Sequence, residues 1–182
     1  VETGVNYVMI ISSNAGLWGY NLGDTVQFTS LEPYRVIVTG RIKHFISAFG
    51  EHVIAKEVEY AMEEAIKETG ARVNEFTVAP QINPGEDELP YHEWLVEFEK
   101  GPEDEERFIS ILDQSLQRQN SDYFDLIDGN ILQCLRLTYI ETGGFQEYMK
   151  SSGKLGGQNQ VQRLSNDRKL ANGLYPFRRR TG

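Results

Sequence analysis

The sequence predicts an α+β fold: a small antiparallel β subdomain followed by an α+β sandwich with the order helix-strand-strand-helix-strand-helix. Two observations lead to this prediction. Runs rich in β-branched and aromatic residues, separated by Gly, Asn, Asp and Pro, fill the start of the chain. After residue 51, the spacing of apolar residues alternates between helical and strand-like periods.

The β subdomain is predicted from three short runs, 5–12, 25–30 and 35–40, whose composition is typical of strands. The segments 18–24 and 39–44 connect these runs and lead out of them. Both are polar and rich in turn-forming residues, so we expect linkers there.

The sandwich opens with an amphipathic helix that starts near residue 51 and ends near Gly70. Two strands follow at 73–80 and 91–99, joined by an acidic turn at 83–88. The helix is indicated by apolar residues at steps of three and four: Ile54, Val58, Ala61, Met62, Ala65 and Ile66.

The second half begins with a helix over 102–118 and a short helical piece over 121–128. A third strand at 132–141 and a short helix at 145–150 complete the sandwich. We expect the helices to cover one face of the sheet. From about Ser151 the chain is rich in glycine and polar residues, which favours a loop or ligand-facing segment over core.

Charge and composition exclude several classes of protein. The 182 residues carry a formal charge of −9, which repels nucleic acids and anionic membranes. No apolar run approaches the ~20 residues needed to span a bilayer, and no secretory signal is visible, so we expect a cytoplasmic protein. The single cysteine, Cys134, is expected to be a buried, inert thiol. The start at Val1 looks cut from something longer.

Two polar positions in the β subdomain could bind a nucleotide. Asp24 ends the run that starts at Tyr20, and a carboxylate there can accept hydrogen bonds from two vicinal ribose hydroxyls. Arg41 ends a strand, where its guanidinium could meet a phosphate or carboxylate. Viewed one at a time, both positions are explained better by ordinary polar turns. His44 has no companions at ligand spacing, so we expect no metal site and no catalytic triad.

At two further positions, Glu51 and Lys154, a functional role competes with a purely structural one. Glu51 precedes the long helix, where capping accounts for it better than catalysis does. Lys154 lies between glycines, where the backbone can bend and an ammonium can reach a phosphate. A flexible surface loop would look the same.

Taken in order, these motifs resemble the end of the adenylate-forming superfamily, and most closely the auxin-responsive acyl-acid amido synthetases. The resemblance is carried by 20–24, 40–46, Gly50-Glu51 and 154–158, and extends over about 5–174. Plant members join hormone carboxylic acids to amino acids. We expect a bacterial homologue.

The resemblance implies a division of the chain and a set of roles. Residues 1–43 would end a large N-terminal domain, and 44–182 would form a mobile C-terminal α+β domain. Asp24 would bind the ribose hydroxyls of ATP, Tyr20 would lie near adenine and ribose, and Arg41 near ribose and phosphate. Lys43 would stand at the hinge, where many relatives keep an acid.

The adenylation lysine is implied less directly. Ser152-Gly153-Lys154 fits the superfamily pattern of a lysine that reaches the acyl phosphate. An alternative alignment places the family lysine at residue 160, which is a glutamine here. Under that alignment the chain lacks its adenylation lysine.

The implied reaction is an ATP- and Mg-dependent ligation in two steps. A carboxylic acid is adenylated, and an amine such as an amino acid, or a thiol, then displaces AMP. The chain contains no Ser/Thr/Gly-rich phosphate loop, so we expect it to depend on an N-terminal adenylation domain and to be inactive alone. The alternatives are a noncatalytic module that binds a small ligand or a protein, or a degenerate homologue.

Overall fold

The computed structural model describes residues 1–16, 18–41, 45–85, 88–153 and 160–179. At 21–23, 41 and 45 the description is limited to the backbone. Within these ranges no helix is long and apolar enough to cross a membrane.

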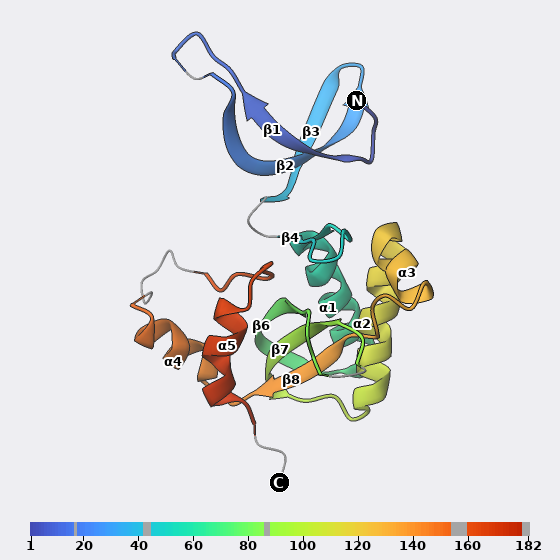
Figure 1. Cartoon of the computed structure of the whole chain (residues 1–182), viewed down its shortest axis with the longest axis vertical. Helices are drawn as coiled ribbons and strands as arrows, with labels where there is room; N and C mark the ends of the chain where they lie inside the picture. Colours follow the sequence, from blue (N-terminus) through green and yellow to red (C-terminus); the bar gives the residue numbers. More distant parts are fainter. Residues whose placement is uncertain (17, 42–44, 86–87, 154–159, 180–182) are drawn as a thin grey trace.

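The N-terminal part is a separate three-stranded antiparallel sheet at one end of the molecule (Figure 1). Its strands are β1 (Asn6–Ile11), β2 (Tyr20–Leu31) and β3 (Tyr34–Arg41), with β2 in the centre. The three predicted strands are confirmed. The expected linker over 18–24 is wrong from residue 20 onward, because β2 begins at Tyr20 and pairs with Ile11 of β1.

This sheet buries little. Val26 is its single buried hydrophobic residue among those described, whereas Val8, Ile10, Val36, Ile37 and Val38 are all at least 40% exposed. Consecutive residues of a strand point to opposite faces. The run Val36–Val38 therefore exposes aliphatic side chains on both faces of the sheet.

A short two-stranded ladder connects the sheet to the first helix. It consists of β4 (Phe45–Ile46) and β5 (Val53–Ile54), paired antiparallel, and leads directly into α1 (Ala55–Thr69). The carboxylate of Glu57 accepts from the backbone N–H of Ile54 and so caps the start of α1. Gly70 ends the helix in the left-handed conformation, at φ 68°, as predicted for its C-terminus.

The second sheet has the order β6-β7-β8 and forms the centre of the α+β domain. β6 (Arg72–Gln81) and β7 (Tyr91–Lys100) are antiparallel, whereas β8 (Arg136–Ile140) runs parallel to β7. The connection from β7 to β8 consists of α2 (Glu105–Gln119) and α3 (Ser121–Asp128). Asn120 ends α2 and also caps α3, because its side chain accepts from the N–H of Tyr123.

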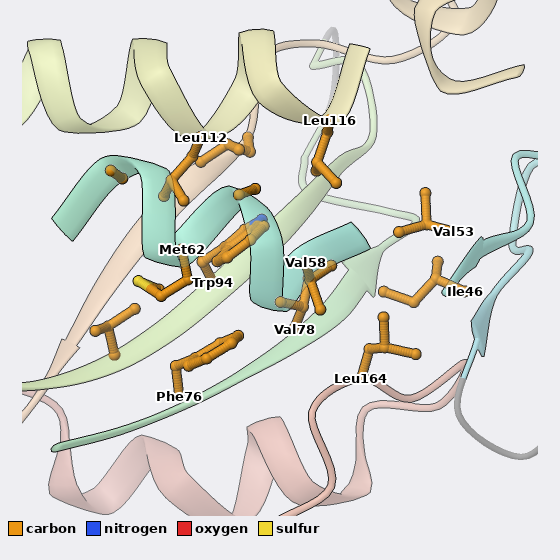
Figure 2. Close-up of a cluster of buried hydrophobic side chains, with 14 of the residues drawn as sticks. Ile46, Val53, Val58, Met62, Phe76, Val78, Trp94, Leu112, Leu116 and Leu164 are labelled. Atoms are coloured by element: carbon orange, nitrogen blue, oxygen red, sulfur yellow. The ribbon is translucent and has the colours of Figure 1, made fainter. Parts of the chain in front are cut away.

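Helices cover both faces of this sheet, so the expectation of one covered face is wrong. On one face, Trp94 and Phe76 pack against α1 and α2, in the core that also contains Leu112 (Figure 2). On the other, Leu95 packs with α4 (Gly144–Ser151) and α5 (Lys169–Leu174). The run Trp94–Val96 is apolar at each position, and that pattern is typical of a strand buried on both sides.

The C-terminal stretch is more structured than the sequence suggests. Leu164, Ala171 and Leu174 are fully buried, so the expectation of a loop without core residues is wrong beyond residue 160. The glycines that favoured a loop are concentrated before that residue, and the apolar residues come after it.

The same stretch also borders both edges of the second sheet. Residues 163–165 run beside β6, where the N–H of Val78 donates to the carbonyl of Arg163 at 2.8 Å. The 3₁₀ turn η1 (Tyr175–Phe177) leads into residues that pair beside β8, where Arg179 N–H donates to Tyr139.

Candidate functional site

Asp24 and Arg41 lie directly opposite each other in the first sheet. Their Cα positions pair across β2 and β3, next to the pair formed by Thr25 and Gly40. Asp24 is partly buried. Arg41 is the last residue of β3, as predicted for a guanidinium at a strand end.

Two irregularities of the sheet lie at or next to this pair of positions. The register of β1 with β2 shifts between Val8 and Ile10, and that of β2 with β3 shifts between Thr25 and Val26. Bulges re-aim side chains and are frequent next to active sites. The regular strand pairing is therefore interrupted at or next to Asp24 and Arg41, the two positions that the sequence singles out.

A buried hydroxyl stabilises the second irregularity. Thr39 is the residue that the register shift leaves over on β3, and it is 7% exposed. Its hydroxyl donates to Asn6 Oδ1 at 2.8 Å and lies 3.1 Å from Thr25 Oγ1. These contacts join all three strands immediately beside Asp24 and Arg41, so the backbone that presents the two positions is held in place.

The other predicted site residues are only partly described. Tyr20 begins β2 and is 51% exposed, which leaves its ring accessible. Lys43 and Lys154 lie outside the described residues, so their roles stay predictions. Gln160, at the alternative position of the family lysine, is exposed.

Gln160 lines a polar pocket of about 540 Å³. The pocket lies between the start of α1, the end of α4 and the segment before α5. It is lined by Ala55, Glu59, Tyr148, Met149, Gln160, Val161, Gln162, Arg163, Ser165, Asp167, Lys169 and Leu170. Arg163 pairs there with Glu59 and Glu75, so its charge is already compensated.

Glu51 has a different environment from the one expected. It does not cap α1, since Glu57 does so, and instead lies fully buried against His92 of β7. His92 Nε2 donates to Glu51 Oε1 at 2.8 Å, and the N–H of Phe49 donates to Oε2 at 2.9 Å. Burial alone would raise the pKa of this carboxyl. The hydrogen bond and the positive charge of His92 outweigh it and lower the pKa of Glu51 below its usual value.

His92 is held in turn by two other elements. Its ring stacks on that of Tyr123 in α3, with centroids 5.2 Å apart, and the Tyr123 hydroxyl donates to Asp113 of α2 at 2.7 Å. Burial, reinforced by the nearby carboxylate of Asp113, raises the pKa of Tyr123 well above its usual value. The sequence gives no signal for this network, because Glu51 and His92 are far apart in the chain.

Cys134 is exposed rather than buried, which corrects the expectation. Although the residue is exposed as a whole, neighbouring atoms partly shield its sulfur from water. This desolvation, together with the nearby carboxylate of Asp113, raises the pKa of the thiol to about 11. It is therefore protonated at neutral pH. Because the thiolate is the reactive form, a raised pKa disfavours reaction of this thiol, and its inertness stays a prediction.

Two more buried carboxylates of β7 have structural partners. Glu93 accepts from Thr138, Tyr175 and Arg168. Glu97 accepts from the N–H groups of Gly143 and Phe145, and so caps the start of α4. In the described part of the chain, no group of three His, Cys, Asp or Glu side chains could hold a metal ion.

Comparisons with known proteins identify the family. The model described as "GH3 family C-terminal domain" matches residues 56–169, and the model described as "GH3 family central domain" matches residues 1–41. A search of curated protein sequences gives no match.

Solved structures add the fold. Chains described as "GH3.15 acyl acid amido synthetase" and "AtGH3.15 acyl acid amido synthetase in complex with 2,4-DB" each superpose with a TM-score of 0.70 at 15% sequence identity. These matches cover 99% of this chain and 35% and 34% of the other two, so the chain spans about a third of their length.

A third structure is the A-PCP didomain of carboxylic acid reductase from Segniliparus rugosus in complex with AMP. It matches with 23% identity over 71% of this chain and 16% of its own, and its TM-score of 0.35 is too low to support an argument. The family models are stronger evidence than this structure, because the model of the C-terminal domain alone covers more than half of the chain. The predicted resemblance to acyl-acid amido synthetases is confirmed, and the chain belongs to the GH3 family, of which it forms a C-terminal part.

Proposed function

We propose that this chain is the C-terminal portion of an ATP-dependent acyl-acid ligase. The ligase adenylates a carboxylic acid and transfers the acyl group to an amine such as an amino acid, or to a thiol. The pairing of Asp24 with Arg41 across β2 and β3 is the observation that carries this proposal. Positions directly opposite in an antiparallel pair are neighbours on one face of the sheet, so both can serve one ligand.

The chemistry of the two residues fits a nucleotide. A carboxylate is an acceptor for two vicinal ribose hydroxyls, and Asp24 is partly buried, which limits competition from water. A guanidinium at position 41 supplies donors for a phosphate. As the carboxylic acid attacks the α-phosphate, negative charge builds on phosphoryl oxygens, and preorganised cations stabilise it.

The Mg²⁺ that accompanies ATP has no ready-made cage in the described part of this chain. Mg²⁺ in nucleotide sites is held by one or two carboxylates and the phosphates themselves. We therefore assign the carboxylates that would hold Mg²⁺ to the larger N-terminal domain of the full-length protein.

That larger domain is the partner we propose for the first sheet. Exposed aliphatic side chains on both faces of β1–β3, such as Ile10 and Val38, mark a surface that is normally covered. An N-terminal adenylation domain would cover them and complete the active site. The isolated chain is therefore inactive in this proposal, and we place the complete ligase in the cytoplasm.

Acid-dependent exchange of labelled pyrophosphate into ATP, measured on the full-length parent protein, tests the adenylation step. Asp24→Ala should reduce the exchange and weaken the binding of an acyl-adenylate analogue. Glu32→Gln, which changes an exposed carboxylate in the turn between β2 and β3, is the matched control and should leave both unchanged. Exchange that is insensitive to Asp24→Ala would contradict the proposal.

The lysine that acts in adenylation requires a separate experiment. We assign the role to Lys154, so Lys154→Ala should abolish exchange. If exchange persists in this variant, the assignment is wrong.

A degenerate homologue without turnover is the second candidate, and Gln160 is the residue that favours it. Under this alternative the parent protein shows no exchange with any acid, and Gln160→Lys raises it. A plain binding module would respond neither to adenylate analogues nor to either substitution.

A further inference from the structure

The segment that leads from the first sheet into the α+β domain has unusual anchoring. We call residues 46–54 the hinge clasp. It contains Ile46 of β4 and Val53 of β5, which pair with each other and are fully buried beside Leu164 (Figure 2). A ladder of two residues per strand is too short to hold itself together. Other contacts must fix the hinge clasp.

One contact is buried and charged. Glu51, in the loop of the hinge clasp, receives hydrogen bonds from His92 and from the N–H of Phe49. Both side chains of the Glu51–His92 pair are 0% exposed. A carboxylate is buried at this depth only where its partners compensate for lost water, so the pair fixes the loop at one place.

That place is the centre of the domain. His92 belongs to β7, the middle strand of its sheet, and its ring is stacked on Tyr123 of α3. Tyr123 is bonded to Asp113 of α2. His92 Nδ1 has no hydrogen-bond partner in the described ranges, so Glu51 and Tyr123 are the contacts that orient the ring.

A second, weaker contact joins the hinge clasp to the C-terminal segment. The N–H of Ser47 donates to Asn166 Oδ1 at 2.7 Å. Asn166 directly follows residues 163–165, which run beside β6; Arg163 and Ser165 of this stretch line the polar pocket. The hinge clasp is thus attached to the domain from two directions.

We propose that Glu51 is a positioning residue: its carboxylate fixes the hinge clasp to the centre of the α+β domain, so that both move as one body. This inference rests on the proposed function and on the mobile C-terminal domain that the family resemblance implies: we take this domain to rotate between one position for adenylation and another for acyl transfer. Rotation is then confined to the chain before residue 46. The orientation of the domain in each position is then well defined, because residues 46–54 cannot move relative to the sheet.

Hydrogen exchange of the 182-residue chain tests the anchoring without any activity. Glu51→Gln retains an acceptor for Phe49 and removes the charge, so the amides of 46–54 should exchange about tenfold faster or more, by local opening. The core amides of α1 and α2 should accelerate less than these, because they exchange only through global unfolding. Glu99→Gln, in an exposed pair with Arg72, is the matched control and should behave as wild type.

Two results would overturn the inference. One is unchanged exchange in 46–54 of Glu51→Gln. The other is a rise that merely parallels the core, which would make the pair a general stabiliser. Asn166→Ala leaves the buried pair intact and should loosen the hinge clasp less than Glu51→Gln. A larger effect of Asn166→Ala would transfer the positioning role away from Glu51.

The full-length parent provides the functional measurement. Glu51→Gln should change the ratio of amide formation to pyrophosphate exchange by roughly tenfold or more, because misplacing a reacting group by about 1 Å costs up to ~10²-fold in rate. An equal fall in both half-reactions, or none, would refute the positioning role. A wild-type parent that shows no exchange with any acid would refute the proposed function instead, and the hydrogen-exchange result would stand.

Discussion

The two sheets of this chain differ in how much of their surface they bury. The sheet β6-β7-β8 has both faces packed under helices and its central residues, such as Trp94 and Leu95, fully buried. The sheet β1-β2-β3 has a comparable content of aliphatic residues and leaves most of them exposed. Hydrophobic composition alone therefore does not mark a completed core. The second sheet is covered within this chain, and the exposure of the first supports our proposal that a larger domain covers it in the full-length protein.

The largest expected effect is in the completed core. Trp94 is fully buried and stacked on Phe76 with ring centroids 5.7 Å apart, so Trp94→Ala should lower the free energy of unfolding by about 3–5 kcal/mol. Urea unfolding measures this. Phe124→Ala removes an exposed ring and should cost below about 1 kcal/mol. If both variants lost a similar free energy of unfolding, the core around Trp94 would not be the main source of the chain's stability.

The buried pair should give an effect of similar size, and this effect depends on pH. Glu51→Ala leaves His92 without its partner and should cost about 3–5 kcal/mol at neutral pH. The folded-state pKa of Glu51 is below the usual value of 4.5, so the contribution is complete above that pH. It is lost as the pH falls through the lowered pKa.

The difference in stability between wild type and Glu51→Ala should therefore shrink in acid. Unfolding titrations at a series of pH values measure it. A difference that grows on acidification would contradict the lowered pKa of Glu51.

A helix cap should have a smaller effect. Asp104 caps α2 by accepting from the N–H of Arg107 at 2.9 Å, so Asp104→Ala should cost about 1 kcal/mol in urea unfolding. Asp104→Asn keeps the acceptor and should recover most of that loss. No recovery would mean that charge rather than the hydrogen bond matters there.

The smallest effect is expected in the first sheet. Val38 is 66% exposed, so Val38→Ser should change the stability of this chain by less than about 0.5 kcal/mol. In the full-length parent the same substitution should destabilise more, because the proposed partner domain covers this surface. Equal effects in both proteins would mean that no partner domain covers Val38, and would contradict our explanation for the exposed side chains of the first sheet.

Periodicity predicted the elements well where they are amphipathic. The strands β6 and β7 and the end of the first helix at Gly70 match their predicted ranges closely. The start of this helix, expected near residue 51, is wrong, because Val53 and Ile54 form β5 and α1 begins at Ala55. The start of β2 was misjudged, since Asn, Gly and Asp are typical of turns and only pairing with β1 makes this stretch a strand. Leu164 and Leu174 were missed because the glycines before them dominate the local composition.

The candidate site could be predicted only in part. Motif order singled out Asp24 and Arg41, and the register brings these two positions together, although their binding role stays a prediction. The exposure of Cys134 and the partner of Glu51 depend on tertiary packing. No local pattern can report a contact between a loop residue and a strand so far along the chain.

The borders of the second sheet have a consequence for biosynthesis. β6 and β8 obtain their outer neighbours from residues 163–165 and from the residues around Arg178, which leave the ribosome after both strands. Until then, a nascent chain presents two unpaired strand edges, and such edges recruit other polypeptides into aggregates. Truncation just before residue 163 removes both neighbours and should reproduce that state permanently, so chaperone dependence and insolubility are its expected signs.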